Sequence, residues 1–248
     1  MDRETRSQLA HAGHPVAAPV GDPAVERLIG RALALPAGAA GSPRLLDLGC
    51  GRAEWLLRAL AAHPTATAHG VDVSAPALAA ARAAAEARGL TGRLSLHQVP
   101  AAEHADPDPY DVVLSVGATH AFGGGLAATL DAAGRHLAPG GHLVLGHGYW
   151  ERPPGPEVVE LLGDHADLPG TLDLVTAAGW TPVYGHVSSR EELDDYEWSW
   201  TGSLAAWALD HPQHPDHAEA LAAATAHRTE WLTTYRGVWG FVTLVLRR

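Results

Sequence analysis

Two carboxylates stand at the ends of predicted strands, where they could take part in ligand binding. Asp47 lies in the segment 44–57, whose pattern is that of a buried strand, a glycine turn and the start of a helix. Gly49 and Gly51 allow the backbone to approach a ligand closely, and the helix that follows directs free N–H groups at it. A carboxylate two positions before Gly49 would repel a pyrophosphate, so it favours a ligand that carries a cationic amine.

The second carboxylate, Asp72, follows Asp47 by 25 residues and ends the strand predicted over 68–74. In a βαβ unit, an acid at this place reaches a ribose and accepts hydrogen bonds from both of its hydroxyls. Cys50 lies inside the glycine turn, where a small residue is needed, so packing is the simpler interpretation of this single cysteine. The two acids together predict a nucleoside ligand with an amine.

The turn at Asp47, Gly49 and Gly51 resembles the first motif of class I S-adenosylmethionine-dependent methyltransferases, with Ala53 in place of the third glycine. Further landmarks of that family follow in the right order, including the turn before strand five at 137–145. The resemblance implies S-adenosylmethionine as cofactor, S-adenosylhomocysteine as product, and Asp47 near the amino group of the methionine part. It also implies a cofactor contact set, which comprises Asp47, Gly49, Cys50, Gly51, Asp72, Val73, Ala101, Ala102, Glu103, Ser115, Val116 and Gly117.

The adenine contact departs from the family pattern. Where the family often has Asp-Ala after strand three, this chain has Pro100 preceded by valine and followed by Ala101, Ala102 and Glu103. Pro100 lacks both a side-chain acceptor and an N–H. We therefore expect the contact to come from the backbone at Ala101 or Ala102, or from the carboxylate of Glu103.

The methyl acceptor is expected beyond the carboxyl ends of strands four and five, because ligands of open α/β sheets bind there. His120 could orient or deprotonate an acceptor, since an ordinary imidazole titrates near neutrality, or it could hydrogen-bond to loop backbone. His147 is the second catalytic candidate. The substrate candidates are Phe122, Tyr149, Trp150, Glu151, Tyr196 and Trp200, although Trp150 could equally pack under a cap and Glu151 could form a surface pair with Arg152.

The long connection 188–237 is predicted to form a helical substrate cap between strands six and seven. It contains two amphipathic stretches, 190–210 and 216–236, separated by a proline-containing break at 211–215. Its aromatic residues allow two interpretations, helix packing or a cation–π box for an amine. Packing is the commoner role of aromatic residues at helical spacing. The segments 147–154 and 196–200 also resemble a group of bacterial small-molecule methyltransferases.

The resemblance implies an α/β fold class, with a Rossmann-like seven-stranded sheet, parallel except for an antiparallel last strand and flanked by helices. We expect strands over 44–48, 68–74, 93–99, 110–116, within 137–149, over 180–187 and over 238–246. Helices are expected over 23–35, 55–62, 74–88, 126–137, 157–162 and 171–178, with a proline- and glycine-rich connection at 36–43. Residues 1–22 are predicted to be flexible or to dock on binding, and 23–248 to form the methyltransferase domain.

Composition limits the classes of partner. The net charge of −11 disfavours a nucleic-acid partner, no apolar run is long enough for a bilayer, and one cysteine excludes an intrachain disulfide. The chain is therefore expected in the cytoplasm, with a small-molecule partner and no membrane partner. Sixteen histidines raise the question of a metal, but His211, His214 and His217 flank prolines, and no ligand motif accompanies them, so no metal is predicted.

These observations predict methyl transfer from S-adenosylmethionine to an oxygen or nitrogen atom of a small molecule. A nicotinamide-dependent oxidoreductase is the first alternative. Asp47 and the absence of a glycine at position 54, which is a glutamate, disfavour it. The second alternative is a cofactor-binding fold used for sensing or for another reaction, which the altered adenine motif leaves open.

Overall fold

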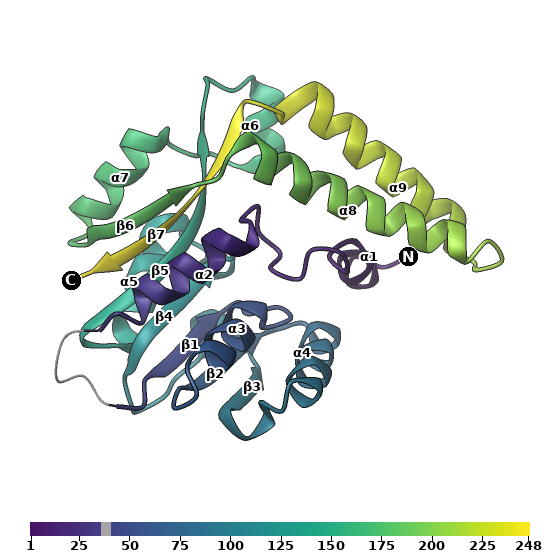
Figure 1. Cartoon of the computed structure of the whole chain (residues 1–248). Coiled ribbons are helices and arrows are strands. Elements are labelled where there is room, and N and C mark those ends of the chain that lie inside the picture. The colour runs from purple at the N-terminus through teal and green to yellow at the C-terminus, as the bar shows by residue number, and fades with distance from the viewer. Residues whose placement is uncertain (36–40) are drawn as a thin grey trace.

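A computed structural model of the chain describes residues 1–35 and 41–248, and its centre is a seven-stranded sheet (Figure 1). The order of the strands is β3-β2-β1-β4-β5-β7-β6, and only β7 runs antiparallel to its neighbours. The strand bounds are β1 Arg44–Leu48, β2 Thr67–Asp72, β3 Leu94–Gln98, β4 Tyr110–Val116, β5 Leu137–Trp150, β6 Thr181–Val187 and β7 Trp239–Arg247. The predicted fold class is confirmed.

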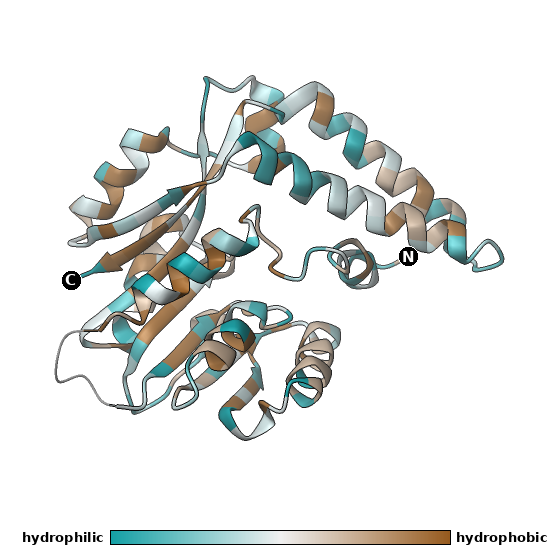
Figure 2. Cartoon of the chain, viewed as in Figure 1, coloured by the Kyte–Doolittle hydropathy of each residue, from teal (hydrophilic) through white to brown (hydrophobic). Residues whose placement is uncertain are grey.

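Helices cover both faces of the sheet because the parallel strands are apolar on both sides. Leu45 of β1 points into the core shared with α2 (Asp22–Ala32), α3 (Glu54–Ala62) and α4 (Ala75–Ala87). Leu46, the next residue, lies in the core on the opposite face, together with α5 (Gly125–His136) and α7 (Leu168–Ala177). Figure 2 shows apolar strands in the sheet and both hydrophobic and hydrophilic residues on the helices around it.

Strand β5 is longer than the sequence indicated. It continues to Trp150 because β7 pairs with it along its whole second half, from Leu143↔Leu246 to Trp150↔Trp239. The residues from His147 to Trp150, which were expected at and beyond the end of strand five, are therefore strand residues, and the strand ends later than expected. Short helix α6 (Pro156–Leu162) follows.

The connection between β6 and β7 forms a helical hairpin. Helix α8 (Arg190–Asp210) begins with a capping box in which Ser189 and Glu192 exchange side-chain and backbone hydrogen bonds. Helix α9 (His217–Glu230) passes into a π-helical turn, η4 (Trp231–Tyr235), so the helix expected to reach position 236 changes its geometry after Glu230. The hairpin projects beyond the sheet in Figure 1.

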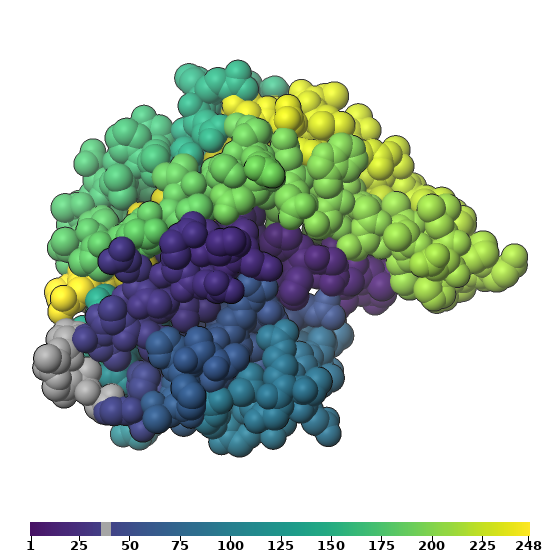
Figure 3. Space-filling model, in the orientation of Figure 1, coloured from purple at the N-terminus to yellow at the C-terminus, as the bar shows by residue number. Residues whose placement is uncertain are grey.

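The N-terminal segment is docked in this structure, whereas the sequence predicted a flexible segment or one that docks on binding. Helix α1 (Arg3–Ala10) begins at Asp2, whose carboxylate accepts a hydrogen bond from the Thr5 N–H at 2.7 Å. It packs on α8 and α4, and Figure 3 shows the segment filling the space between the hairpin and the first half of the sheet. Of the connection expected at 36–43, residues 36–40 lie outside the described part of the chain.

Candidate active site

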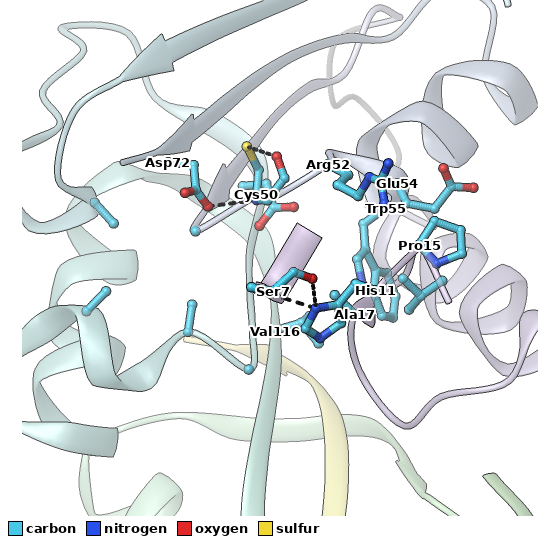
Figure 4. A pocket seen from close by; sticks show the side chains of 18 of the residues that line it. Ser7, His11, Pro15, Ala17, Cys50, Arg52, Glu54, Trp55, Asp72 and Val116 are labelled. Atoms are coloured by element: carbon cyan, nitrogen blue, oxygen red, sulfur yellow. Dashed lines mark hydrogen bonds between the residues drawn. The ribbon is translucent and has the colours of Figure 1, made fainter. Parts of the chain in front are cut away.

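A cavity of about 390 Å³ opens at the carboxyl ends of β1, β2 and β4 (Figure 4). Its size is within the range of small-molecule sites, and its position is the one expected for a ligand of an open α/β sheet. Nine of the predicted cofactor residues line it, namely Asp47, Gly49, Cys50, Gly51, Asp72, Val73, Ala101, Val116 and Gly117.

The glycine turn explains how the backbone reaches the cavity. Gly49 has φ +91°, and a Cβ built on it would lie 2.5 Å from the Cβ of Ala118 in the loop after β4. Gly51 has φ +52° and open space beside it. Ala53, in place of the third glycine, adopts the left-handed conformation at φ +58°, so the turn keeps its shape despite the substitution.

Asp72 is held in place by the backbone. The N–H of Gly51 donates to Oδ2 and the N–H of Ser74 donates to Oδ1, each at 2.8 Å. Both carboxylate oxygens are thereby fixed at the wall of the cavity, where a carboxylate that has further lone pairs can accept hydroxyl donors.

Asp47 has an unusual electrostatic environment. It is 3% exposed, and burial together with the nearby Asp72 carboxylate raises its pKa to about 8. A buried carboxyl group of this kind holds a proton near neutrality, and an adjacent cation would favour its ionised form. The site therefore suits a ligand that brings positive charge to Asp47.

Cys50 is a packing residue. Its Sγ lies 2.8 Å from the position that a Cβ on Gly70 would take, and burial raises the pKa of its thiol well above the ordinary value. A thiol with a raised pKa carries little thiolate, so Cys50 is a poor nucleophile.

The N-terminal segment closes the cavity. The sequence did not indicate that residues of this segment line it. Ser7 of α1 and His11, the C-cap residue of that helix, line it, and His11 Nε2 lies 3.1 Å from the hydroxyl of Tyr196 on α8. Burial lowers the pKa of His11, and its Nδ1 lies 2.8 Å from the Ser7 carbonyl oxygen. No motif links positions 11 and 196, so only their contact in the fold identifies the pair. The other lining residues not predicted are Pro15, Val16, Ala17, Arg52, Glu54, Trp55, Ala118 and Ala121.

Three predicted cofactor residues lie outside the lining of this cavity. Ala102 and Glu103 are exposed in the short helix η2 (Ala101–Glu103), whereas Ala101 faces the cavity. Ser115 is fully buried in β4, and its hydroxyl donates to the Leu48 carbonyl at 3.4 Å. Of the adenine candidates, the structure brings only Ala101 to the cavity wall.

The two candidate catalytic histidines are placed differently. His120, in the short helix η3 (Thr119–Phe122), lines this cavity and also a neighbouring one between α5, α6 and α7. His147 of β5 lines only the neighbouring cavity, and burial beside His165 lowers its pKa to about 4. Phe122 packs against the core on the α5 face rather than lining either cavity.

The residues Tyr149, Trp150 and Glu151 border a third, more open hollow that neither Asp47 nor Asp72 lines. Trp150 is 6% exposed and packs with Trp231 and Tyr235, while Glu151 forms an ion pair with Arg190. Burial and the Glu151 carboxylate raise the pKa of Tyr149 to about 12. These residues therefore connect β5 with the hairpin.

The aromatic residues of the hairpin do not form one box. Trp200 stacks on His227 with ring centroids 4.1 Å apart, and Trp198 meets Trp231 edge-on at 5.4 Å. Of the predicted substrate residues, only Tyr196 lines the cavity that contains Asp47 and Asp72. The packing interpretation accounts for the other aromatic side chains, including Trp200.

The described residues contain neither a membrane-spanning helix nor a metal-binding cluster. None of the helices there has the length and apolar character needed to cross a membrane. Within the same ranges, 1–35 and 41–248, there is no group of three or more histidine, cysteine or acidic side chains that could hold a metal ion.

Comparison with known proteins agrees with the fold. A family model described as a methyltransferase domain matches residues 46–143. The uncharacterized protein YjhP of Escherichia coli (strain K12) is 29% identical over 227 residues, which cover 88% of this chain and 89% of that protein.

Two solved structures, each in complex with S-adenosyl-L-homocysteine, are similar over the whole chain. The SAM-dependent methyltransferase from Geobacter sulfurreducens has a TM-score of 0.86 and 26% identity, and that from Thiobacillus denitrificans has 0.84 and 25%. Each comparison covers 100% of this chain and 98% of the other. The fold, the glycine turn and these likenesses support a class I S-adenosylmethionine-dependent methyltransferase.

Proposed function

We propose that the chain transfers a methyl group from S-adenosylmethionine to an oxygen or nitrogen atom of a small molecule, in the cytoplasm. The main support for the proposal is that Asp47 and Asp72 line the same cavity beside the glycine turn. Asp72, held by two backbone N–H groups, accepts hydrogen bonds from the ribose hydroxyls. Asp47 interacts with the amino group of the methionine part, whose positive charge offsets the desolvation of the carboxylate.

The bound cofactor supplies a methyl group activated by its sulfonium. The chain's own residues align the acceptor with that group, which is the main contribution a protein makes to an in-line displacement. With the cofactor bound, a lone pair of the acceptor would form the new bond to the methyl carbon, and the electrons of the broken carbon–sulfur bond would remain on sulfur. Where the acceptor must lose a proton, the exposed imidazole of His120 accepts it and passes it to water.

Calorimetric titration with S-adenosylmethionine, S-adenosylhomocysteine and NADH tests the first part of this proposal. We expect both sulfur nucleotides to bind and NADH not to bind, because Asp47 would face a pyrophosphate. Binding of NADH alone by a folded protein would indicate the oxidoreductase alternative. Binding of the sulfur nucleotides without methyl transfer to any acceptor would indicate a fold that uses the cofactor for sensing or another reaction.

The Asp72→Ala variant tests the ribose contact. Loss of hydrogen bonds to a charged acceptor should weaken S-adenosylhomocysteine binding by about 1–3 kcal/mol, roughly 5- to 150-fold in Kd. Asp173→Ala, a change at an exposed residue of α7, serves as the matched control and should leave Kd unchanged. Equal affinities of the two variants would refute the assignment of Asp72.

A further inference from the structure

A second cavity adjoins the one that contains Asp47 and Asp72. It has a volume of about 450 Å³ and lies between α5, α6, α7 and the second half of β5. Thr119 and His120 of η3 stand at the junction, because His120 lines both cavities. A molecule bound in the second cavity would therefore extend toward the first one past His120.

Leucine side chains form much of the wall of this second cavity. Leu126 and Leu130 of α5 lie on one side, and Leu162 and Leu174 belong to α6 and α7. Such a lining takes up an apolar body, and specificity in sites of this kind comes from a small number of well-placed polar groups.

Three residues that line this cavity each have a buried polar atom with no partner among the described residues. The atoms are His147 Nδ1, His165 Nδ1 and Thr171 Oγ1. His147 is 8% exposed and Thr171 only 1%. Buried polar groups are nearly always hydrogen-bonded, so three such atoms around one cavity indicate a ligand that completes their bonds.

The hydrogen-bonding character of this group can be assigned. His165 Nε2 lies 3.0 Å from the Leu162 carbonyl, to which it donates, so Nδ1 of the neutral ring carries a lone pair. Burial lowers the pKa of both histidines, and their ring centroids are 5.2 Å apart, so charging both rings would cost mutual repulsion. His165 Nδ1 can therefore accept a hydrogen bond from a ligand hydroxyl or N–H.

Charge narrows the ligand class further. No arginine lines the cavity among the described residues, and its one acidic side chain, Asp164, is exposed at the rim. A buried anionic ligand would find no partner there, and a buried cation would face two neutral imidazoles. An uncharged ligand avoids both desolvation costs.

We propose that this cavity holds the methyl acceptor, an uncharged and largely apolar molecule with a hydroxyl or N–H group that binds His147, His165 and Thr171. This inference rests on the proposed function and assigns that function's substrate class. The anchoring group is distinct from the atom that receives the methyl group, which lies toward His120. His147 is thereby a binding residue rather than the proton acceptor.

Ligand-observed NMR in the presence of S-adenosylhomocysteine tests the proposal with three probes of similar size: 4-hydroxybenzyl alcohol, 4-hydroxybenzoate and tyramine. We expect the uncharged alcohol to bind, and the anion and the cation to bind at least several-fold more weakly. Failure of the alcohol to bind, or equal binding of all three probes, would overturn the proposal. Calorimetry with S-adenosylhomocysteine alone separates this failure from failure of the proposed function.

Two variants locate the binding. Thr171→Val keeps the shape of the side chain and should weaken binding of the alcohol roughly 2- to 10-fold, while raising the Tm of the ligand-free protein because an unpaired buried hydroxyl is removed. Its matched control is Thr176→Val in the same helix, whose hydroxyl donates to Leu172 outside the cavity. The control should not change the affinity, and equal affinities for both variants would contradict the assignment.

A second variant, Ala127→Trp, fills the mouth of the cavity from an exposed position of α5. It should abolish binding of the alcohol and leave the affinity for S-adenosylhomocysteine as it is. Retained binding of the alcohol would contradict the location of the site, whatever the behaviour of the Thr171 variant.

Discussion

Asp47 is the residue whose protonation should dominate the pH dependence of the ligand-free protein. Its pKa of about 8 in the folded state exceeds the ordinary value of an unfolded chain, so the folded state binds more protons than the unfolded state between these two values. Stability from this group is therefore fully present below about pH 4 and is lost as the pH rises to about 8.

The Asp47→Asn variant should remove this loss. Variant and wild type should be about equally stable at pH 4, and the variant should be more stable at pH 8, by roughly 2–5 kcal/mol. Urea unfolding at the two pH values measures the difference. A constant difference between the proteins across this range would contradict the raised pKa.

Position 49 requires a positive φ angle and has no space for a Cβ, and only glycine satisfies both conditions. Gly49→Ala would place a methyl group against the Ala118 side chain in a left-handed backbone, at a cost of about 2 kcal/mol or more. Gly30→Ala provides the control, since Gly30 lies within α2 with open space beside its Cα and should gain about 0.5–1 kcal/mol. Thermal unfolding of both variants gives the comparison, and a harmless Gly49→Ala would argue against the close approach of the two loops.

The hairpin contains two tyrosines with different roles. Tyr196 meets His11 across the candidate cofactor cavity, whereas Tyr235 donates to the buried Glu197 at 2.9 Å, away from that cavity. Glu197 Oε2 also lies 2.7 Å from His227 Nε2, so this second group joins α8 to the end of α9.

Phenylalanine substitutions should separate the two roles. Tyr196→Phe removes the hydroxyl contact with His11 and should raise the Kd for S-adenosylhomocysteine by roughly 2- to 10-fold. Tyr235→Phe should leave Kd unchanged and lower the free energy of unfolding by about 1–2 kcal/mol, because a buried carboxylate loses its donor. Calorimetry measures Kd and urea unfolding measures the free energy of unfolding. The same changes in both quantities for the two variants would contradict separate roles of Tyr196 and Tyr235.

The order of elements was predictable from the sequence because most strands have an apolar run and most turns carry glycine or proline. The length of β5 was not, since the partner β7 decides how far β5 stays in the sheet, and that pairing joins Trp150 to Trp239. The Asp47–Gly51 turn and Asp72 could be located because local sequence alone forms that part of the cavity. His11, Tyr196 and the group of His147, His165 and Thr171 come together only through tertiary packing, which leaves no local pattern.

At the scale of the whole molecule, the net charge of −11 should influence cofactor association. S-adenosylmethionine carries a sulfonium charge that S-adenosylhomocysteine lacks, so the protein's field attracts it more strongly. Its association rate should fall as ionic strength rises from 0.01 to about 0.3 M, whereas the rate for S-adenosylhomocysteine should change little. Stopped-flow measurement of both nucleotides tests this difference, and parallel salt dependences would rule out steering by net charge.

The direct pairing of β6 with β7 affects how this protein could diversify. Val187 lies opposite Val242, so the chain leaves and re-enters the sheet at neighbouring points on either side of the hairpin. Segments of different length can be exchanged between these two points without changing the register of a single strand. The junctions near Ser189 and Arg236 are thus natural crossover points for recombination, in evolution and in the laboratory, through which a new lid could be grafted onto an unchanged nucleotide-binding scaffold.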